Sequence, residues 1–295
     1  MKGEVDMIYK DLSNEDYHKM AGISSSILKA AIVSEAHLDN YIRKGVKNKA
    51  VVLGDAIHAC LLEPERFEKS YGIEQDVYKK NINGHIAGSP KLDDDGEPIM
   101  AYRHNIDSSK DITGEEFKKL QAMIKAANES EIAQNLLALK SDVELSAIIE
   151  EDGRILKVRP DFITKDNWIV DIKSVGGFAD KPSSPDNFSR AFYDNGYDIQ
   201  MYMYYNVLSK AMGIEFKGFK FLCLDATVPS GVQVYTFVNG ESKWFELGGY
   251  RFNKALEIYD RYKQNKVHKV YENETPDDLP LSYKAEEYLA IARGE

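Results

Sequence analysis

Cysteine is scarce in this chain. Only Cys60 and Cys223 occur among 295 residues. Two cysteines are too few for a disulfide framework or for the four thiolates that usually hold an iron–sulfur cluster. We therefore expect neither kind of stabilisation, and no iron–sulfur cofactor.

Long apolar runs and nucleotide-binding motifs are also missing. No run of about eighteen apolar residues occurs, and the opening sequence MKGEVDMIYK lacks the apolar core of an export signal. We therefore expect a cytoplasmic protein without a membrane span. Because neither a Walker phosphate loop nor a dinucleotide fingerprint occurs, ATP is not expected as a cofactor.

Positive charge is in deficit, with 38 Lys and Arg against 48 Asp and Glu and a formal net charge of −10. This balance argues against DNA binding by the whole surface, because phosphate contacts supply much of the affinity of DNA-binding proteins. The distribution of the cations matters more than their sum. Arg43, Lys44, Lys47 and Lys49 form a basic run between two expected helices. This run is either a DNA contact or a solvated loop.

The most informative stretch is residues 157–174, KVRPDFITKDNWIVDIKS. It places Asp161 upstream of an apolar strand that carries Asp171 and Lys173. Side chains two apart on a strand share a face, so Asp171 and Lys173 face one site. Two carboxylates can hold a hard divalent cation, and a metal or polar cleft would offset the cost of burying these charges. The alternative is an edge strand with a charged outer face.

A hairpin is expected immediately upstream. Residues 143–149 and 154–159 are strand-like, and the Asp-Gly pair at 152–153 between them is typical of a tight turn. Counting by two places Lys157 and Arg159 on the same side as Asp161, unless Pro160 introduces a bulge. Two cations beside an acidic ligand would suit a phosphodiester.

A helix is expected around residues 198–208. Gln200 and Tyr204 are four residues apart and so share one helical face. Core packing would explain the tyrosine alone. A glutamine one turn before it, following the strand motif, favours a pair that faces DNA.

Together these motifs resemble the PD-(D/E)xK nuclease superfamily. Within its RecB-like branch, the chain is similar to the RecE-type exonuclease (exonuclease VIII) domains of phages and prophages. The resemblance covers roughly residues 10–265. Four stretches support it besides the strand and helix motifs: residues 23–29 (ISSSILK), 53–58 (LGDAIH), 144–146 (ELS) and 157–161 (KVRPD).

The resemblance implies a role for each matched residue. The implied metal ligands are His58, Asp161, Asp171 and the backbone carbonyl of Ile172, with Glu144 as a further candidate, directly or through water. Lys173 would be the catalytic lysine. Gln200 and Tyr204 would touch the DNA backbone or organise the site. From the helix expected over residues 51–62 alone, a packed histidine is the favoured interpretation of His58. The match of Gly54 and of the downstream motif favours a metal ligand instead.

The implied fold is α/β, with a restriction-endonuclease-like core in which helices flank a mixed central β-sheet. Residues 1–265 would form one nuclease domain with an N-terminal helical elaboration, and residues 266–295 a polar C-terminal extension. Besides the core strands, the expected elements are helices near 24–44, 51–62, 115–138, 186–212 and 241–264, strands at 219–224 and 232–237, and an irregular polar segment at 76–112.

The implied activity is a Mg²⁺-dependent exonuclease, with Mn²⁺ as a substitute. It would degrade linear double-stranded DNA from 5′ to 3′ and leave 3′ tails for a single-strand annealing partner of RecT type. The resemblance further suggests a tetrameric ring and a phage or prophage origin in a bacterial host. Two alternatives remain open: an endonuclease with the same catalytic residues, and an inactive DNA-binding or assembly protein.

Overall fold

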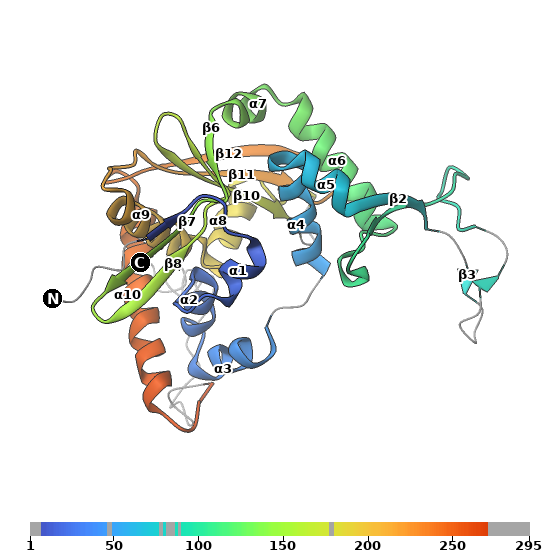
Figure 1. Ribbon diagram of the computed structural model, residues 1–295. Helices are drawn as coiled ribbons and strands as arrows, with labels where there is room; N and C mark the ends of the chain where they lie inside the picture. Colours follow the sequence, from blue (N-terminus) through green and yellow to red (C-terminus); the bar gives the residue numbers. More distant parts are fainter. Residues whose placement is uncertain are drawn as a thin grey trace, which may run out of the picture.

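Two β-sheets meet at a corner inside the protein (Figure 1). The computed structural model describes residues 7–45, 49–76, 79–80, 86–87, 90–176 and 180–270. None of the helices in these ranges is long and apolar enough to cross a membrane.

The main sheet has five strands in the order β12-β11-β10-β9-β6. Its central strand β10 (Trp168–Val175) pairs in parallel with β11 (Gly218–Asp225) and antiparallel with β9 (Phe162–Thr164). At the two edges lie the antiparallel strands β12 (Val232–Val238) and β6 (Lys140–Val143). The sheet is therefore mixed, which confirms the predicted fold class.

Both faces of this sheet are buried, in two apolar clusters. Ile169 belongs to the cluster beneath helices α8 (Pro185–Asp194), α9 (Tyr197–Met212) and α10 (Lys243–Gln264). Val170 and Ile172 belong to the opposite cluster, which packs against other helices. Those helices are α4 (Lys49–Leu62), α5 (Pro64–Ser70), α6 (Glu115–Glu129) and α7 (Glu131–Ala138). By strand alternation, Asp171 and Lys173 lie on the α9 side.

The second sheet has three antiparallel strands, β1 (Met7–Tyr9), β7 (Ser146–Glu151) and β8 (Arg154–Val158), in the order β1-β7-β8. The predicted hairpin between β7 and β8 is confirmed. Both residues of its turn have positive φ, 50° at Asp152 and 73° at Gly153, as a tight hairpin requires.

The prediction of one continuous strand over 143–149 is wrong. The chain leaves the main sheet at Val143 and enters the second sheet at Ser146. Between them Glu144 adopts φ 53°, a left-handed conformation that breaks the strand. The return chain leaves β8 at Val158 and enters β9 at Phe162, so Asp161 lies at the same corner.

Three of the expected helices are each two helices. The helix expected over 24–44 is α2 (Ser25–Ala31) and α3 (Glu35–Lys44), and Ser34 caps the second by accepting from the His37 amide. Ser130 caps α7 in the same way and so ends the helix expected over 115–138. Gly196, at φ 62°, separates α8 from α9. Serine caps and a left-handed glycine explain these breaks.

The segment predicted to be irregular, residues 76–112, contains three strands among its described residues, and one of them pairs with a strand just before the segment. β2 (Tyr71–Gln75) pairs with β5 (Met100–His104), and this hairpin extends away from the two sheets (Figure 1). The short strands β3 (Lys79–Lys80) and β4 (Ile86–Ala87) pair with each other. Helix α1 (Asn14–Lys19), which Ser13 caps, was not predicted.

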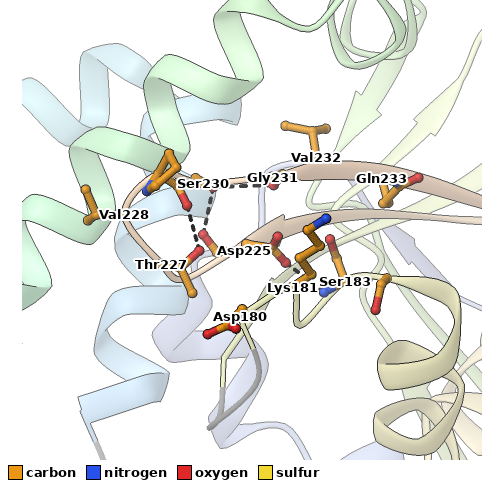
Figure 2. Close-up of a pocket in the computed structure, with 12 residues that line it drawn as sticks. Asp180, Lys181, Ser183, Asp225, Thr227, Val228, Ser230, Gly231, Val232 and Gln233 are labelled. Atoms are coloured by element: carbon orange, nitrogen blue, oxygen red, sulfur yellow. Dashed lines mark hydrogen bonds between the residues drawn. The ribbon is translucent and has the colours of Figure 1, made fainter.

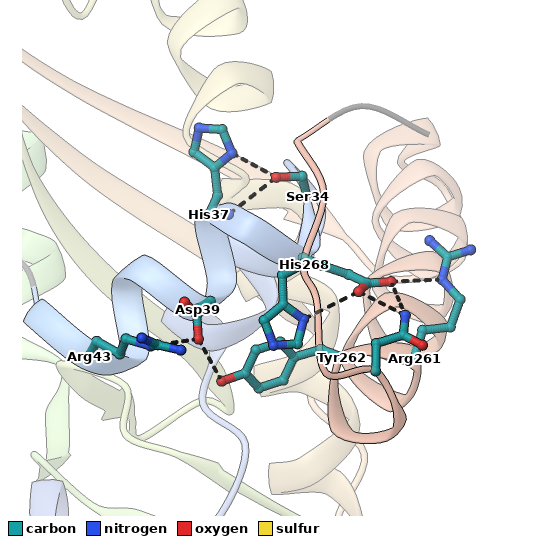
Figure 3. Close-up of polar contacts among 9 residues, drawn as sticks. Ser34, His37, Asp39, Arg43, Arg261, Tyr262 and His268 are labelled. Atoms are coloured by element: carbon teal, nitrogen blue, oxygen red, sulfur yellow. Dashed lines mark hydrogen bonds and ion pairs between the residues drawn. The ribbon is translucent and has the colours of Figure 1, made fainter. Parts of the chain in front are cut away.

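The segment after α10 folds back onto α3 (Figure 3). Glu35 accepts a hydrogen bond from Asn265 Nδ2 at 3.0 Å, and its carboxylate lies 3.4 Å from His268 Nδ1. The ring of His268 packs on Tyr262 at 4.3 Å between centroids. Residues 266–270 therefore contact the body of the protein. The domain boundary at residue 265 stays a prediction, and residues 271–295 lie outside the described part of the chain.

Helices α9 and α10 approach closely at a glycine. A Cβ atom on Gly248 would lie 2.4 Å from the carbonyl oxygen of Asp198, which a side chain cannot occupy. Next to this contact, Arg251 donates to the buried Asp198 carboxylate at 2.7 Å. The backbone approach therefore holds α9, and with it Gln200, in place.

We expect Gly248→Ala to destabilise the protein, although Gly to Ala in a helix interior normally stabilises it. Overpacking against the Asp198 carbonyl should cost about 1–3 kcal/mol in the free energy of unfolding. Urea denaturation would measure this change. Asn253→Ala, at an exposed position of α10, is the control and should be neutral or mildly stabilising. An equal or greater stability of Gly248→Ala would contradict the contact.

Candidate active site

Two carboxylates and a histidine converge where the sheets meet. Glu144 and Asp161 lie on the two chain segments that cross the corner, and the Glu144 amide donates to the Asp161 carbonyl oxygen at 3.0 Å. His58 reaches them from α4, with Nδ1 3.1 Å from Asp161 Oδ1. The strand break therefore brings together side chains that the sequence separates widely.

These three side chains can hold a metal ion. One ligand atom from each of His58, Glu144 and Asp161 lies within 4.8 Å of the others. The backbone amide of Ile172 donates a short hydrogen bond to Asp161 Oδ2, which fixes that carboxylate. The Ile172 carbonyl oxygen lies 2.9 Å from His58 Nε2 and borders the same place. Two carboxylates and one imidazole suit Mg²⁺ or Mn²⁺, so the residues fit the expected metal.

Their protonation is set by burial and by each other. Burial alone would lower the pKa of His58, but attraction to Asp161 and Asp171 raises it to about 9. Burial, followed by repulsion from Asp161, raises the pKa of Glu144 to about 7. A metal ligand must be deprotonated, so a cation that binds here displaces protons.

Asp171 is not a member of this three-residue group. Its Oδ2 forms a close ion pair with Lys173 Nζ, and its Oδ1 accepts from Gln200 Nε2 at 2.5 Å. Burial, chiefly, raises the pKa of Asp171. In this structure Asp171 is thus paired with Lys173. Glu144, which the sequence offered only as a further candidate ligand, lies with His58 and Asp161.

Lys173 is held as a cation. Burial would lower its pKa, but the Asp171 carboxylate keeps that pKa well above its ordinary value. Its Nζ also lies 4.7 Å from the ring centroid of Tyr197 and 3.2 Å from Gln200 Oε1. A permanently charged ammonium is suited to stabilise negative charge rather than to accept a proton.

The glutamine and tyrosine of α9 share a face, but they have different surroundings. Gln200 is only 4% exposed and bridges Asp171 and Lys173. Tyr204, 7% exposed, packs against Phe219, and burial raises its pKa well above the usual range. The Gln200 amide thus contacts both charged groups, whereas Tyr204 belongs to the apolar core.

One site residue was not assigned from the sequence. Lys29 Nζ donates to Gln200 Oε1 at 2.7 Å and lies 5.0 Å from the ring centroid of Tyr197. Burial and the neighbouring Lys173 lower the pKa of Lys29. Its motif, residues 23–29, was recognised. Its role was not, because Gln200 is 171 positions away and no local spacing connects the two.

Two cations expected to contact DNA are directed inward. Lys157 Nζ donates to the carbonyl oxygens of Met20 at 2.6 Å and Tyr17 at 2.9 Å. Arg159 donates to Ser146 Oγ at 2.7 Å and lies 4.4 Å from the Tyr17 ring centroid. Both side chains are buried. Lys157 therefore holds the end of α1 against β8. Arg159 joins the segment before α1 to Ser146 and lies 3.6 Å from the Glu144 carboxylate. Both cations have partners within the protein, and their contact with DNA stays a prediction.

The basic run lies at the end of α3. Arg43 is paired with Asp39 at 2.8 Å, and Lys44 is exposed. Lys47 and the side chain of Lys49 lie outside the described residues. The assignment of this run to DNA binding stays a prediction.

A cavity of about 700 Å³ opens beyond the ends of β10 and β11 (Figure 2). Asp225 pairs with Val175 in register, so it faces the same side of the sheet as Lys173. Its carboxylate accepts from the Ser183 amide at 2.7 Å, and its carbonyl accepts from Ser230 Oγ at 2.7 Å. Asp225 therefore joins the two loops that line this cavity.

Comparison with known proteins agrees with this geometry. Residues 24–274 match the model of a family described as a PDDEXK-like domain of unknown function (DUF3799). The chain belongs to this family. No match is found among curated proteins. A crystal structure of a "putative exonuclease" from Eubacterium rectale is similar, with a TM-score of 0.59 at 13% identity, over 92% of this chain and 96% of that chain. At this identity the likeness shows the fold alone. The family match shows that the domain is PDDEXK-like, as predicted.

The first prediction from the site concerns the pH dependence of metal binding. His58 and Glu144 must lose their protons to act as ligands, so Mn²⁺ affinity should rise at least about tenfold between pH 6.5 and pH 8.5. Calorimetric titration in buffers of different ionisation enthalpy would also count the protons released. In Glu144→Gln the affinity should fall at both pH values. Equal affinity of the wild-type protein at the two pH values would contradict the assigned ligands.

A second prediction tests the inward direction of Lys157. Lys157→Met leaves buried carbonyl oxygens without their donor, so the free energy of unfolding should fall by about 1–3 kcal/mol. Fluorescence titration with a DNA duplex should show an unchanged Kd for the folded variant. Lys125→Met, on the exposed surface of α6, is the matched control for loss of a lysine. Weaker DNA binding with unchanged stability would indicate that Lys157 contacts DNA.

Proposed function

We propose that this protein is a metal-dependent nuclease that hydrolyses phosphodiester bonds in DNA. The observation that carries the proposal is the placement of His58, Glu144 and Asp161 around one point, close to a charged lysine on β10. The PD-(D/E)xK fold supports it. An assembled site also argues against the inactive alternative, because Asp161, Asp171 and Lys173 are all present.

The metal would be held by His58, Glu144 and Asp161. When bound, Mg²⁺, or Mn²⁺ in its place, would polarise the scissile phosphate and lower the pKa of the attacking water. The Ile172 amide keeps the Asp161 carboxylate in its orientation through the short hydrogen bond to Oδ2.

Lys173, held by Asp171 and Gln200, would stabilise the negative charge around the phosphate. Lys173 is a fixed cation and offsets negative charge that develops on the phosphate oxygens. Asp171 and Gln200 hold its ammonium from two sides, through the ion pair and the amide oxygen. Because these contacts fix the ammonium, little reorganisation of its position is needed during the reaction.

The finer activity in the proposal follows from the family resemblance. The protein would digest linear double-stranded DNA from 5′ to 3′ and leave 3′ tails for an annealing protein of RecT type. Without an ATP motif, sustained digestion requires that the enzyme stay on the strand by geometry, and a ring of four subunits built from one repeated interface achieves this. The setting would be the cytoplasm of a bacterial host that carries the phage or prophage gene.

One experiment tests both activity and end requirement. The purified protein is incubated with Mg²⁺ and either a linear duplex or the same DNA as a covalently closed circle. We expect the linear duplex alone to be degraded, with label at the 5′ end released first. Lys173→Met and Asp161→Asn should each slow cleavage about 10²- to 10³-fold.

The outcomes separate the candidates. Cleavage of closed circles at a comparable rate would assign an endonuclease. Release of 3′ label first would reverse the polarity. No cleavage with Mg²⁺ or Mn²⁺, despite tight DNA binding, would favour the inactive DNA-binding alternative. Light scattering under active conditions would measure the oligomeric state. A monomer would contradict the proposed ring.

A further inference from the structure

Two lysines share one amide oxygen in the candidate site. Gln200 Oε1 accepts from Lys29 at 2.7 Å and from Lys173 at 3.2 Å, while Gln200 Nε2 donates to Asp171 at 2.5 Å. An ammonium can only donate and a carboxylate only accept, so these partners allow one orientation of the amide. Lys29 makes the shorter of the two contacts to the oxygen.

Lys173 is paired with a carboxylate, whereas Lys29 is hydrogen-bonded to a neutral amide. Asp171 forms its ion pair with Lys173. Among the described residues, the direct polar partner found for Lys29 is the neutral Gln200, and its ammonium also faces the ring of Tyr197. Burying a cation without a carboxylate partner is costly, and this burial, together with the neighbouring Lys173, lowers the pKa of Lys29.

Packing alone would not require the ammonium. The stem of Lys29 lies against Gly196, where a Cβ atom would come within 3.0 Å of Lys29 Cγ. This contact ties α2 to the start of α9, and a methionine could make it equally well. The charged end must therefore be explained separately from the stem.

We propose that Lys29 is a positioning residue of the nuclease, and that it fixes the Gln200 amide so that Lys173 and Asp171 keep their relative orientation. The inference rests on the proposed function. Lys29 acts through Gln200 on the two groups beside the metal ligands, and its α2 helix thereby becomes part of the site.

The test replaces the ammonium and keeps the stem. Lys29→Met should lower kcat on linear duplex on the order of tenfold, because small misplacement of reacting groups lowers rates strongly. KM for DNA should stay within about threefold, since Gln200 and the protein's DNA-facing surface remain. Lys210→Met is the matched control. Lys210 is an exposed residue of the same helix as Gln200, paired with Glu151, and its replacement should leave kcat unchanged.

A double-mutant cycle separates positioning from a structural role. If Lys29 acts through the amide, Lys29→Met should change kcat less than about twofold once Gln200→Ala is present, because coupled residues are not additive. An equal fall in both backgrounds would overturn the proposal. Should Lys29→Met not fold, Lys29→Gln removes the same charge with a shorter side chain and enters the same cycle.

Failure of the Lys29 inference can be distinguished from failure of the nuclease proposal. An active wild-type protein with a fully active Lys29→Met variant overturns this inference and leaves the nuclease proposal intact. A variant that raises KM and keeps kcat would make Lys29 a DNA-binding residue, which also overturns it. A wild-type protein that cleaves no DNA removes the proposed function and this inference together.

Discussion

The break in the chain at Glu144 is the constraint on which the candidate site depends. A left-handed residue there lets one strand leave the five-stranded sheet and continue in the three-stranded sheet. The hydrogen bond from its amide to the Asp161 carbonyl joins the two crossing segments at 3.0 Å. Both carboxylates therefore lie at the corner, within reach of His58. A straight strand would direct them to different places.

Charge around this corner is divided into two sets. His58, Glu144 and Asp161 form the set that suits a cation, whereas Lys173, Asp171 and Gln200 form an internally paired set. Burial strengthens attraction within each set because the local dielectric is low. The same burial raises the pKa of Glu144 and lowers the pKa of Lys29. Gln200 is the neutral link between the two lysines and the Asp171 carboxylate.

The positions of β10, β11 and β12 were predictable because alternation of apolar and charged residues is local. The placement of Asp171 and Lys173 on one face follows from β10 alone, and the Asp-Gly turn specified the hairpin. Helix breaks were harder to predict, although Ser34, Ser130 and Gly196 carry capping or left-handed signals. The α9 contact with α10 had no local signal, since only the approach of Asp198 explains why Gly248 has no side chain.

By itself the sequence determined the fold class, the family resemblance, and the residues that meet at the site: His58, Asp161, Asp171, Lys173 and Gln200. Only the tertiary structure decided how they pair. Lys157 and Arg159 lie beside Asp161 in sequence, yet Lys157 donates to carbonyl oxygens at the end of α1, and Arg159 donates to Ser146 and Leu12. The structure places Lys29 beside Gln200, and it places Glu144 with His58 and Asp161. The reason is physical: periodicity specifies which face a side chain occupies, whereas its partners come from segments that fold against that face.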